Sequence, residues 1–328
     1  MINKLNSSTL DQNNFSDDVP ISVLMCVFND SGYLENAIKS VLNQTWKNFE
    51  FIIIDDGSYD NTPDTLSKFS ENEDRIKVFR KKNTGLTASL NYGINLCSSP
   101  LIARIDADDL WHSNKLEKQM NVMNKFKYIS LIGTSANLID EKDKVYARKT
   151  YPSIHKKLRK NLLKKKGHFP HSSVIFRKEV VQSLGGYDEN FKRAQDYELW
   201  LRISFEHKIS CINEPLVLIR KHQAQISSGT SEKKQFYDSR KALIKHELSF
   251  YNPKYFQSPD IRFEKVFKDA KPLINKIFVL RRNINKIKKA FIELKFNSVA
   301  KYSVLCLLSP KLLFTYILFG ENYKKFYK

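Results

Sequence analysis

Apolar residues in the first third of the chain form short continuous runs, separated by segments with helical spacing. The run ISVLMCVF at residues 21–28 has the composition and length of a strand that is buried on both faces. An amphipathic helix is predicted next, because apolar residues recur at i, i+3, i+4, i+7 and i+8 in Leu34, Ala37, Ile38, Val41 and Leu42. The pattern repeats, with strands expected at 49–54, 75–80 and 101–105 and helices expected at 63–70 and 86–97.

Strands that alternate with helices predict an α/β fold whose central sheet is mostly parallel, Rossmann-like and flanked by helices. Ligands of such sheets bind outside the carboxyl ends of the strands. Acidic residues stand at three of these predicted ends: Asp30, then Asp55 and Asp56, then Asp106, Asp108 and Asp109. The third strand ends instead in three cations that could face a phosphate, Arg80, Lys81 and Lys82. A site at this edge is therefore predicted, with solvated surface acids as the alternative interpretation.

The composition of the chain indicates the cellular compartment and the class of binding partner. The 328 residues are 41% hydrophobic, which is enough for a substantial core. Cys26, Cys97, Cys211 and Cys306 are scattered without metal-finger spacing, which favours a reducing, cytoplasmic location and no structural zinc. The net charge is +20, of which residues 231–328 carry +14 through 22 Lys and Arg against 8 Asp and Glu. This excess indicates an anionic partner, either nucleic acid or membrane headgroups, or else a solvated lysine-rich surface.

The stretch RIDADDLW at residues 104–111 suggests metal chemistry at the end of the fourth strand. Two aspartates at i and i+2 can present oxygen ligands to Mn²⁺ or Mg²⁺, and such a cation completes its shell with substrate phosphates and water. A calcium-binding EF-hand is excluded, because Trp111 stands where the loop requires glycine. The chain also lacks the GxxxxGK[ST] loop and a GxGxxG after its first strand, which argues against kinases and dehydrogenases.

Several motifs, taken in order, resemble family 2 inverting glycosyltransferases with the GT-A fold. They are VPISVLMCVFND, FEFIIIDDGSYDNT, KKNTGLTASLNYGINLCSSPLIARIDADDLW, HSSVIFRKEV, GGYDENF and QDYELWLR, and they extend from about residue 20 to about residue 227. The resemblance implies transfer of a sugar from a nucleotide diphosphate to an acceptor hydroxyl. It also implies a role in surface polysaccharide or lipid-linked oligosaccharide synthesis.

The resemblance assigns most of the donor site. It places Phe28 and Asn29 beside the nucleotide base, where tyrosine is commoner than phenylalanine, and it makes Asp56 a hydrogen-bond acceptor for the base. Asp106 contacts ribose or diphosphate, Asn83 lies beneath the sugar nucleotide, and Asp108 binds the metal. Arg104 is counted with this set because a buried arginine beside the acids would pair with them. His222 is the second expected metal ligand, and a purely structural histidine is the alternative at both His222 and His171.

Asp196 is the expected catalytic base. An inverting transferase needs a carboxylate that takes the proton of the attacking acceptor hydroxyl. Leu199, Trp200 and Ile203 predict a helix anchored in the core, with Asp196 in its first turn. The family match names the same residue, although Gln195 replaces the glutamate that usually precedes it. An acid stabilised by the helix dipole is the alternative interpretation.

The expected organisation is a polar tail at 1–19, a GT-A domain at 20–229 and a basic helical extension at 230–328. Within the domain, residues 20–110 form the nucleotide-binding half and residues 111–229 form the acceptor half. The apolar stretch at 304–319 is too short to cross a bilayer, so the extension is expected either to lie in an anionic membrane interface or to cap the protein. The protein would then be cytoplasmic and peripheral on the inner face of the cell membrane.

Two other functions compete with glycosyl transfer. A nucleotidyltransferase that makes sugar nucleotides would use a similar fold and metal, but its glycine-rich basic loop is missing after the first strand, where the chain reads NDSGYLEN. A noncatalytic nucleic-acid-binding protein would explain the basic extension, but no nucleic-acid motif is present, so nucleic acid is not an expected partner.

Overall fold

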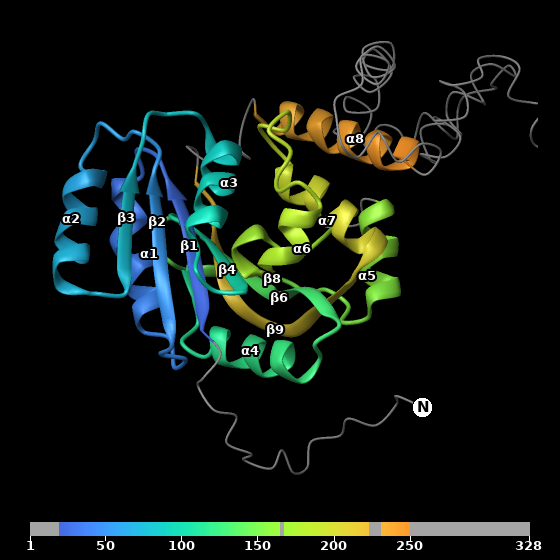
Figure 1. The fold of residues 1–328 in the computed structure, drawn as a ribbon, viewed down its shortest axis with the longest axis horizontal. Coiled ribbons are helices and arrows are strands. Elements are labelled where there is room, and N and C mark those ends of the chain that lie inside the picture. The colour runs from blue at the N-terminus through green and yellow to red at the C-terminus, as the bar shows by residue number, and fades with distance from the viewer. Residues whose placement is uncertain (1–19, 165–166, 223–230, 250–328) are drawn as a thin grey trace, which may run out of the picture.

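The computed structural model describes residues 20–164, 167–222 and 231–249, which form an α/β structure around one sheet (Figure 1). The strands are β1 (Ile21–Val27), β2 (Phe49–Asp55), β3 (Ile76–Arg80), β4 (Leu101–Asp106), β5 (Leu110–Trp111), β6 (Ile129–Ile139), β7 (Val145–Lys149), β8 (Ile175–Arg177) and β9 (Lys208–Arg220). The helices are α1 (Ser31–Leu42), α2 (Thr62–Asn72), α3 (Leu86–Leu96), α4 (Lys115–Lys125), α5 (His155–Leu163), the 3-10 turn η1 (His171–Ser173), α6 (Lys178–Ser183), α7 (Gln195–Glu206) and α8 (Ser231–Ser249).

The first half of the sheet is the predicted Rossmann-like unit. Its strand order is β3-β2-β1-β4, and all three of these pairings are parallel. The chain adds strands on one side of β1 and then crosses to the other side for β4, so the strand order reverses between β1 and β4. Such a switch point opens a crevice at the carboxyl ends of the two strands.

The second half of the sheet combines both pairing types. The order continues β4-β8-β6-β9-β5, where β6 and β9 are parallel and the other pairs are antiparallel, and β7 pairs with β6. In this half, β9 pairs with β5, and β5 comes directly after the acids at the end of β4. The last strand of the sheet therefore delivers its own C-terminal residues to the predicted site.

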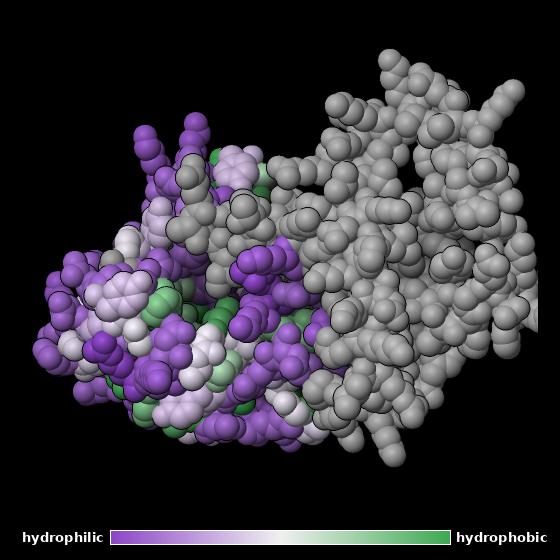
Figure 2. All heavy atoms as spheres, turned by 90° about the horizontal axis from the view of Figure 1, so that it is seen from above, coloured by the Kyte–Doolittle hydropathy of each residue, from purple (hydrophilic) through white to green (hydrophobic). Residues whose placement is uncertain are grey.

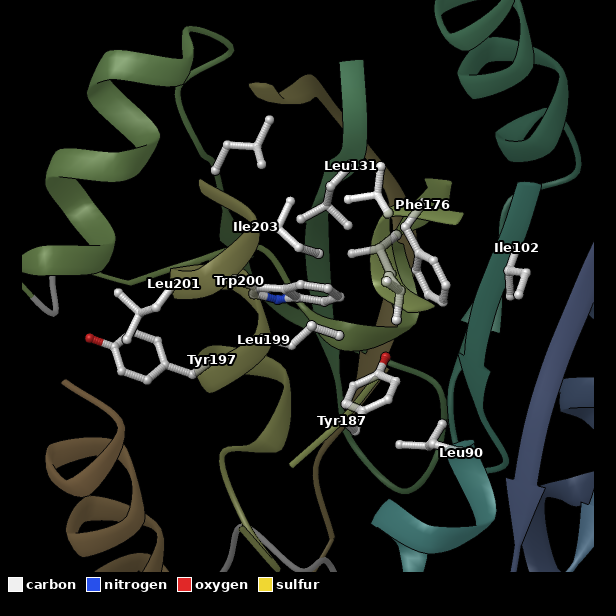
Figure 3. Packing of buried hydrophobic residues seen from close by; sticks show 14 of the residues in the cluster. Leu90, Ile102, Leu131, Phe176, Tyr187, Tyr197, Leu199, Trp200, Leu201 and Ile203 are labelled. Atoms are coloured by element: carbon white, nitrogen blue, oxygen red, sulfur yellow. The ribbon is translucent and has the colours of Figure 1, made fainter. Parts of the chain in front are cut away.

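Two hydrophobic clusters cover opposite faces of the sheet. Because side chains alternate along a strand, β1 sends Leu24 and Cys26 into the cluster that contains α3, and Val23 and Met25 into the cluster that contains α1 and α4. The α3 side also holds α5, α6 and α7. On that side the Trp200 ring lies among Leu131, Phe176, Leu199 and Ile203 (Figure 3). The predicted anchoring of the helix that carries Asp196 is thus confirmed.

Parts of the predicted organisation lie outside the described residues. They are the tail at 1–19, Cys306, the apolar stretch at 304–319 and the rest of the extension after α8. Cys26, Cys97 and Cys211 are buried free thiols. No helix of the described segments has the length and apolar character needed to cross a bilayer.

Candidate active site

The switch point brings the ends of β1 and β4 together. Cys26 pairs with Asp106 in the parallel register, so the residues after β1 lie beside the acids after β4. Val27 pairs with Asp55 on the other side of β1, which adds the loop after β2. The predicted convergence of strand-end acids at one edge is confirmed.

Asp106, Asp108 and Asp109 form a compact acid cluster. Each can offer one carboxylate oxygen so that all three oxygens lie within 4.8 Å of one another. Asp106 is the most exposed member and forms an ion pair with Arg104, which has no accessible surface. Arg104 therefore reaches the site only through Asp106. Its charge holds the pKa of Asp106 below the ordinary value, against the effect of burial.

Asp108 faces the end of β9. Its Oδ2 lies 3.0 Å from Nε2 of His222, two residues after that strand. The His222 ring also lies 5.2 Å from the ring of Tyr33 in α1, measured between centroids. The two residues expected to bind metal are therefore neighbours, although 114 positions separate them in the sequence.

Asp109 is the buried member of the cluster. Its Oδ1 accepts the backbone N–H of Arg220 at 2.9 Å, and its Oδ2 is in hydrogen-bond contact with Oγ of Ser172. Burial, followed by the charges of Asp108 and Asp106, raises the pKa of Asp109 well above its ordinary value. Ser172 also bonds Oδ2 of Asp106 at 3.0 Å. A single hydroxyl proton can be donated to only one of these two carboxylates at a time.

Two residues of this network, Ser172 and Arg220, were missed from the sequence. The Nε of Arg220 donates to the carbonyl of Asp108 at 2.9 Å, and its guanidinium lies 4.2 Å from the centre of the Tyr33 ring. Nothing local distinguishes either residue: Arg220 reads as the polar end of an apolar strand, and Ser172 reads as a small residue beside His171. Their roles depend on which strands become neighbours.

The cluster fits a divalent cation. Burial, then the charge of Asp108, raises the pKa of Asp30 to about 6. Asp30 and Asp109 are thus both harder to ionise beside the other acids, which is the electrostatic condition that a bound cation relieves. Carboxylate oxygens and one imidazole nitrogen form a donor set suited to Mn²⁺ and accessible to Mg²⁺.

Asp56, directly after β2, is held in place by the loop between β3 and α3. Its Oδ1 accepts the amide N–H of Thr84 at 3.0 Å and pairs with Nζ of Lys81, and its Oδ2 accepts the N–H of Gly85 at 2.8 Å. Burial alone would raise the pKa of Asp56, but these hydrogen bonds lower it. Gly85 has φ +93 at the start of α3, where a side chain would be strained. Asn83 lies on the same loop with its side chain exposed.

The end of β1 presents an aromatic surface. Phe28 is 44% exposed, and its ring lies 5.9 Å from that of Tyr59 in an edge-to-face arrangement. Asn29 joins the two loops, because its Oδ1 accepts the backbone N–H of Tyr59 at 2.9 Å. Asn29 therefore helps to position Tyr59 beside Phe28, and its side-chain oxygen is used in this hydrogen bond.

Asp196 lies across the site in the first turn of α7. Its Oδ2 is 4.0 Å from Nδ1 of His168, and its side chain keeps 18% of its surface exposed. Behind it, Nε2 of His171 lies 2.7 Å from the hydroxyl of Tyr187. Burial and then Arg104 lower the pKa of His171 to about 3, while Asp196 and Asp106 act in the opposite direction. His171 thus stands between the base candidate and the acid cluster.

Asn91 and η1 connect the two sides. The side chain of Asn91 in α3 donates to the backbone carbonyl of Tyr187 at 2.9 Å and accepts the backbone N–H of Tyr187 at 2.8 Å. These two bonds position Tyr187, whose hydroxyl contacts His171. In η1, His171 faces Tyr187 and Ser172 faces Asp106. One short turn therefore links the predicted donor side to the predicted acceptor side.

Comparisons with known proteins agree with this geometry. Residues 22–185 match the family model described as "Glycosyl transferase family 2". The O-antigen biosynthesis glycosyltransferase WbnJ of Escherichia coli is 35% identical over 184 residues, which cover 56% of this chain and 71% of the relative.

Two solved structures share the fold. TarS of S. aureus in complex with UDP-GlcNAc has a TM-score of 0.60 and 16% identity, and the match covers 91% of this chain and 81% of that one. Mannosyltransferase PcManGT of Pyrobaculum calidifontis, in complex with GDP-Man and Mn2+, has a TM-score of 0.53 and 13% identity, with 92% and 87% covered. The predicted GT-A fold is confirmed, and the chain belongs to glycosyltransferase family 2.

Proposed function

We propose that this glycosyltransferase moves a sugar, with inversion, from a nucleotide-diphosphate sugar to an acceptor hydroxyl during surface polysaccharide synthesis. The observation that carries the proposal is the acid cluster at the switch point, with His171 of η1 in the electrostatic field of both Asp106 and Asp196. The similarity to an O-antigen enzyme supports the class of acceptor. Family membership favours glycosyl transfer over the nucleotidyltransferase and nucleic-acid-binding alternatives.

The donor side would bind the nucleotide diphosphate. Phe28 offers a half-exposed ring on which a base can stack, and Asp56 would accept a hydrogen bond from the base. Asp108 and His222 would hold Mn²⁺ or Mg²⁺, with Asp106 beside them and Asp109 supporting the loop. A cation held there would stabilise the negative charge that develops on the leaving diphosphate.

The acceptor side would supply the base. Asp196 is partly exposed, as a group that receives a proton from a bound hydroxyl must be, and His168 lies close enough to influence its orientation. The helix that carries Asp196 is fixed by buried residues on its other face, so the carboxylate is held on a rigid element. Direct attack by the acceptor oxygen, on the face opposite the diphosphate, would invert the anomeric centre.

The test is transfer and donor hydrolysis with a panel of UDP-, GDP- and dTDP-sugars. We expect Asp196→Asn to lower turnover by roughly 10²- to 10⁴-fold while nucleotide binding is retained. Asp108→Asn should lose metal-dependent nucleotide binding together with activity. Asp74→Asn, an exposed acid between α2 and β3, is the matched control and should behave like the wild type. Unchanged turnover in both site variants would refute the proposal.

A further inference from the structure

The chain contains a long basic segment without acids. From residue 144 to residue 178 there are 12 Lys or Arg residues and no Asp or Glu. The centre of this segment is α5, whose Leu158 and Leu162 are buried against the core. The opposite side of the helix carries the exposed lysines Lys156, Lys157, Lys160 and Lys164. We call these four lysines, together with Ile154, the α5 basic surface.

The geometry of the α5 basic surface concentrates its charge. Lys156, Lys160 and Lys164 follow one another at intervals of four residues, so they share one side of the helix. Like charges at this spacing destabilise a helix by about 0.2–0.5 kcal/mol per pair. Some lysines elsewhere on the described surface are paired with acids, as Lys39 is with Glu35. None of the four α5 lysines has an acidic partner within the described residues.

An apolar side chain accompanies the charge. Ile154, which immediately precedes α5, is 59% exposed. A large aliphatic side chain next to a row of lysines is the composition of a surface that rests on a bilayer: the lysines meet anionic headgroups and the apolar group enters the interface. The exposed Lys144, Arg148 and Lys149, in and beside β7, extend the positive potential along the chain.

This surface adjoins the acceptor side of the site. The hydroxyl of Tyr197, next to the base candidate, donates to the carbonyl of Leu162 in the last turn of α5 at 2.8 Å. The chain then leads from α5 to His168, whose Nδ1 lies 4.0 Å from Oδ2 of Asp196. An anionic surface bound by α5 would therefore lie on the part of the molecule that carries α7 and Asp196.

We propose that the α5 basic surface docks the enzyme on an anionic phospholipid bilayer, with the Asp196 side of the site next to the headgroups. Such a placement would present a lipid-linked acceptor to Asp196, and that part rests on the proposed function. The bilayer contact itself does not depend on it. This contact is separate from the membrane contact expected of the C-terminal extension, which lies outside the described residues.

The test is co-sedimentation of the full chain with vesicles of phosphatidylglycerol and phosphatidylcholine. The variant Lys156→Gln/Lys157→Gln/Lys160→Gln is compared with Lys47→Gln/Lys68→Gln/Lys127→Gln. The control removes the same net charge from exposed positions elsewhere, and the C-terminal extension is present in both. Each lysine near an anionic membrane contributes on the order of a few-fold in binding, so we expect the α5 variant to bind ~10- to 100-fold more weakly. The control should lose at most a few-fold.

The outcomes separate the competing explanations. Equal losses in the two triple variants would mean that binding follows net charge, and the proposal would be wrong. The proposal would also be wrong if the α5 variant lost affinity for duplex DNA but kept its affinity for vesicles. Donor hydrolysis in the absence of vesicles should be unchanged in the α5 variant, because these lysines are not in the proposed machinery. Failure of the proposed function would appear instead as unchanged turnover in Asp108→Asn and Asp196→Asn.

Discussion

At the scale of single residues, the site depends on side chains whose environment is set by distant parts of the chain. Asp109 shows this most clearly. The DADD motif predicts a metal-binding group of acids, but the structure gives these acids different environments. Ser172 and Arg220 bury Asp109, whereas Asp108 contacts His222. The motif alone indicates the chemistry, and only the packing of η1 and β9 decides which carboxylate is buried and which faces His222.

Lys115 is a second residue whose environment could not be predicted from the neighbouring sequence. The segment SNKLEKQ reads as the polar start of a solvated helix, but Lys115 has no exposed surface. Its Nζ lies 3.7 Å from the centre of the Trp111 ring and has no hydrogen-bond partner among the described residues. Burial lowers the pKa of Lys115 well below 10.5. The neighbouring Trp111 donates to the carbonyl of Ser172 at 2.8 Å.

Lys115→Met should therefore stabilise the protein at pH 7. Between the lowered pKa of Lys115 in the folded chain and 10.5, Lys115 is protonated in the unfolded chain but not in the folded chain. The free energy of unfolding of the wild type therefore rises with pH in this range. The variant lacks this dependence. We expect it to be more stable than the wild type at pH 7, and the difference should shrink as the pH approaches 10.5. Urea unfolding at several pH values measures this, with the exposed Lys125→Met as control; a difference that does not vary with pH would contradict the assignment.

At the scale of elements, the strand order of the parallel half of the sheet was predictable and that of the mixed half was not. The strands expected at 49–54 and 101–105 are β2 (Phe49–Asp55) and β4 (Leu101–Asp106), because buried parallel strands leave continuous apolar runs. The two faces of β1 also follow from simple alternation. By contrast, β8 is only three residues long, and β9 contains Asn213, Glu214 and Pro215. Their places in the sheet come from long-range pairing that no local pattern encodes.

The packing of α3 against the sheet depends on a glycine. A Cβ on Gly93 would lie 2.3 Å from Cδ1 of Leu24 in β1 and 3.1 Å from Cγ1 of Ile54 in β2. Gly93→Ala should therefore destabilise the fold by about 1–3 kcal/mol through overpacking. Gly32→Ala in α1 is the matched control: its Cβ would meet nothing within 4 Å, and alanine should stabilise the helix by up to about 1 kcal/mol. Chemical denaturation of both variants checks the opposite signs, and equal effects would show that α3 is not in close contact with β1.

At the scale of the whole molecule, the fold places two sets of groups on the two sides of a single site. In the proposed function, residues from β1, β2 and β4 would form the donor side, and α7 with η1 would form the acceptor side. The return of β9 closes the arrangement, because His222 and Arg220 meet Asp108 and Asp109. Metal and nucleotide diphosphate would therefore contact several elements at once. Their binding should be coupled to each other and to the stability of the domain.

This coupling leads to a prediction for thermal unfolding. Carboxylates alone repel a diphosphate, and Mn²⁺ alone retains water in place of phosphate ligands, so each ligand should stabilise the protein weakly by itself. Together, at about 100 times the dissociation constant, they should add about 2.7 kcal/mol, which corresponds to roughly 5–10 °C in Tm for a domain of this size. Nucleoside monophosphate with Mn²⁺ should give less stabilisation, because the second phosphate is missing.

Asp108→Asn should abolish the joint stabilisation by metal and nucleotide, and Asp74→Asn should preserve it. A nucleotide diphosphate that stabilises the wild type equally with and without Mn²⁺ would show that the acid cluster binds the donor without a metal.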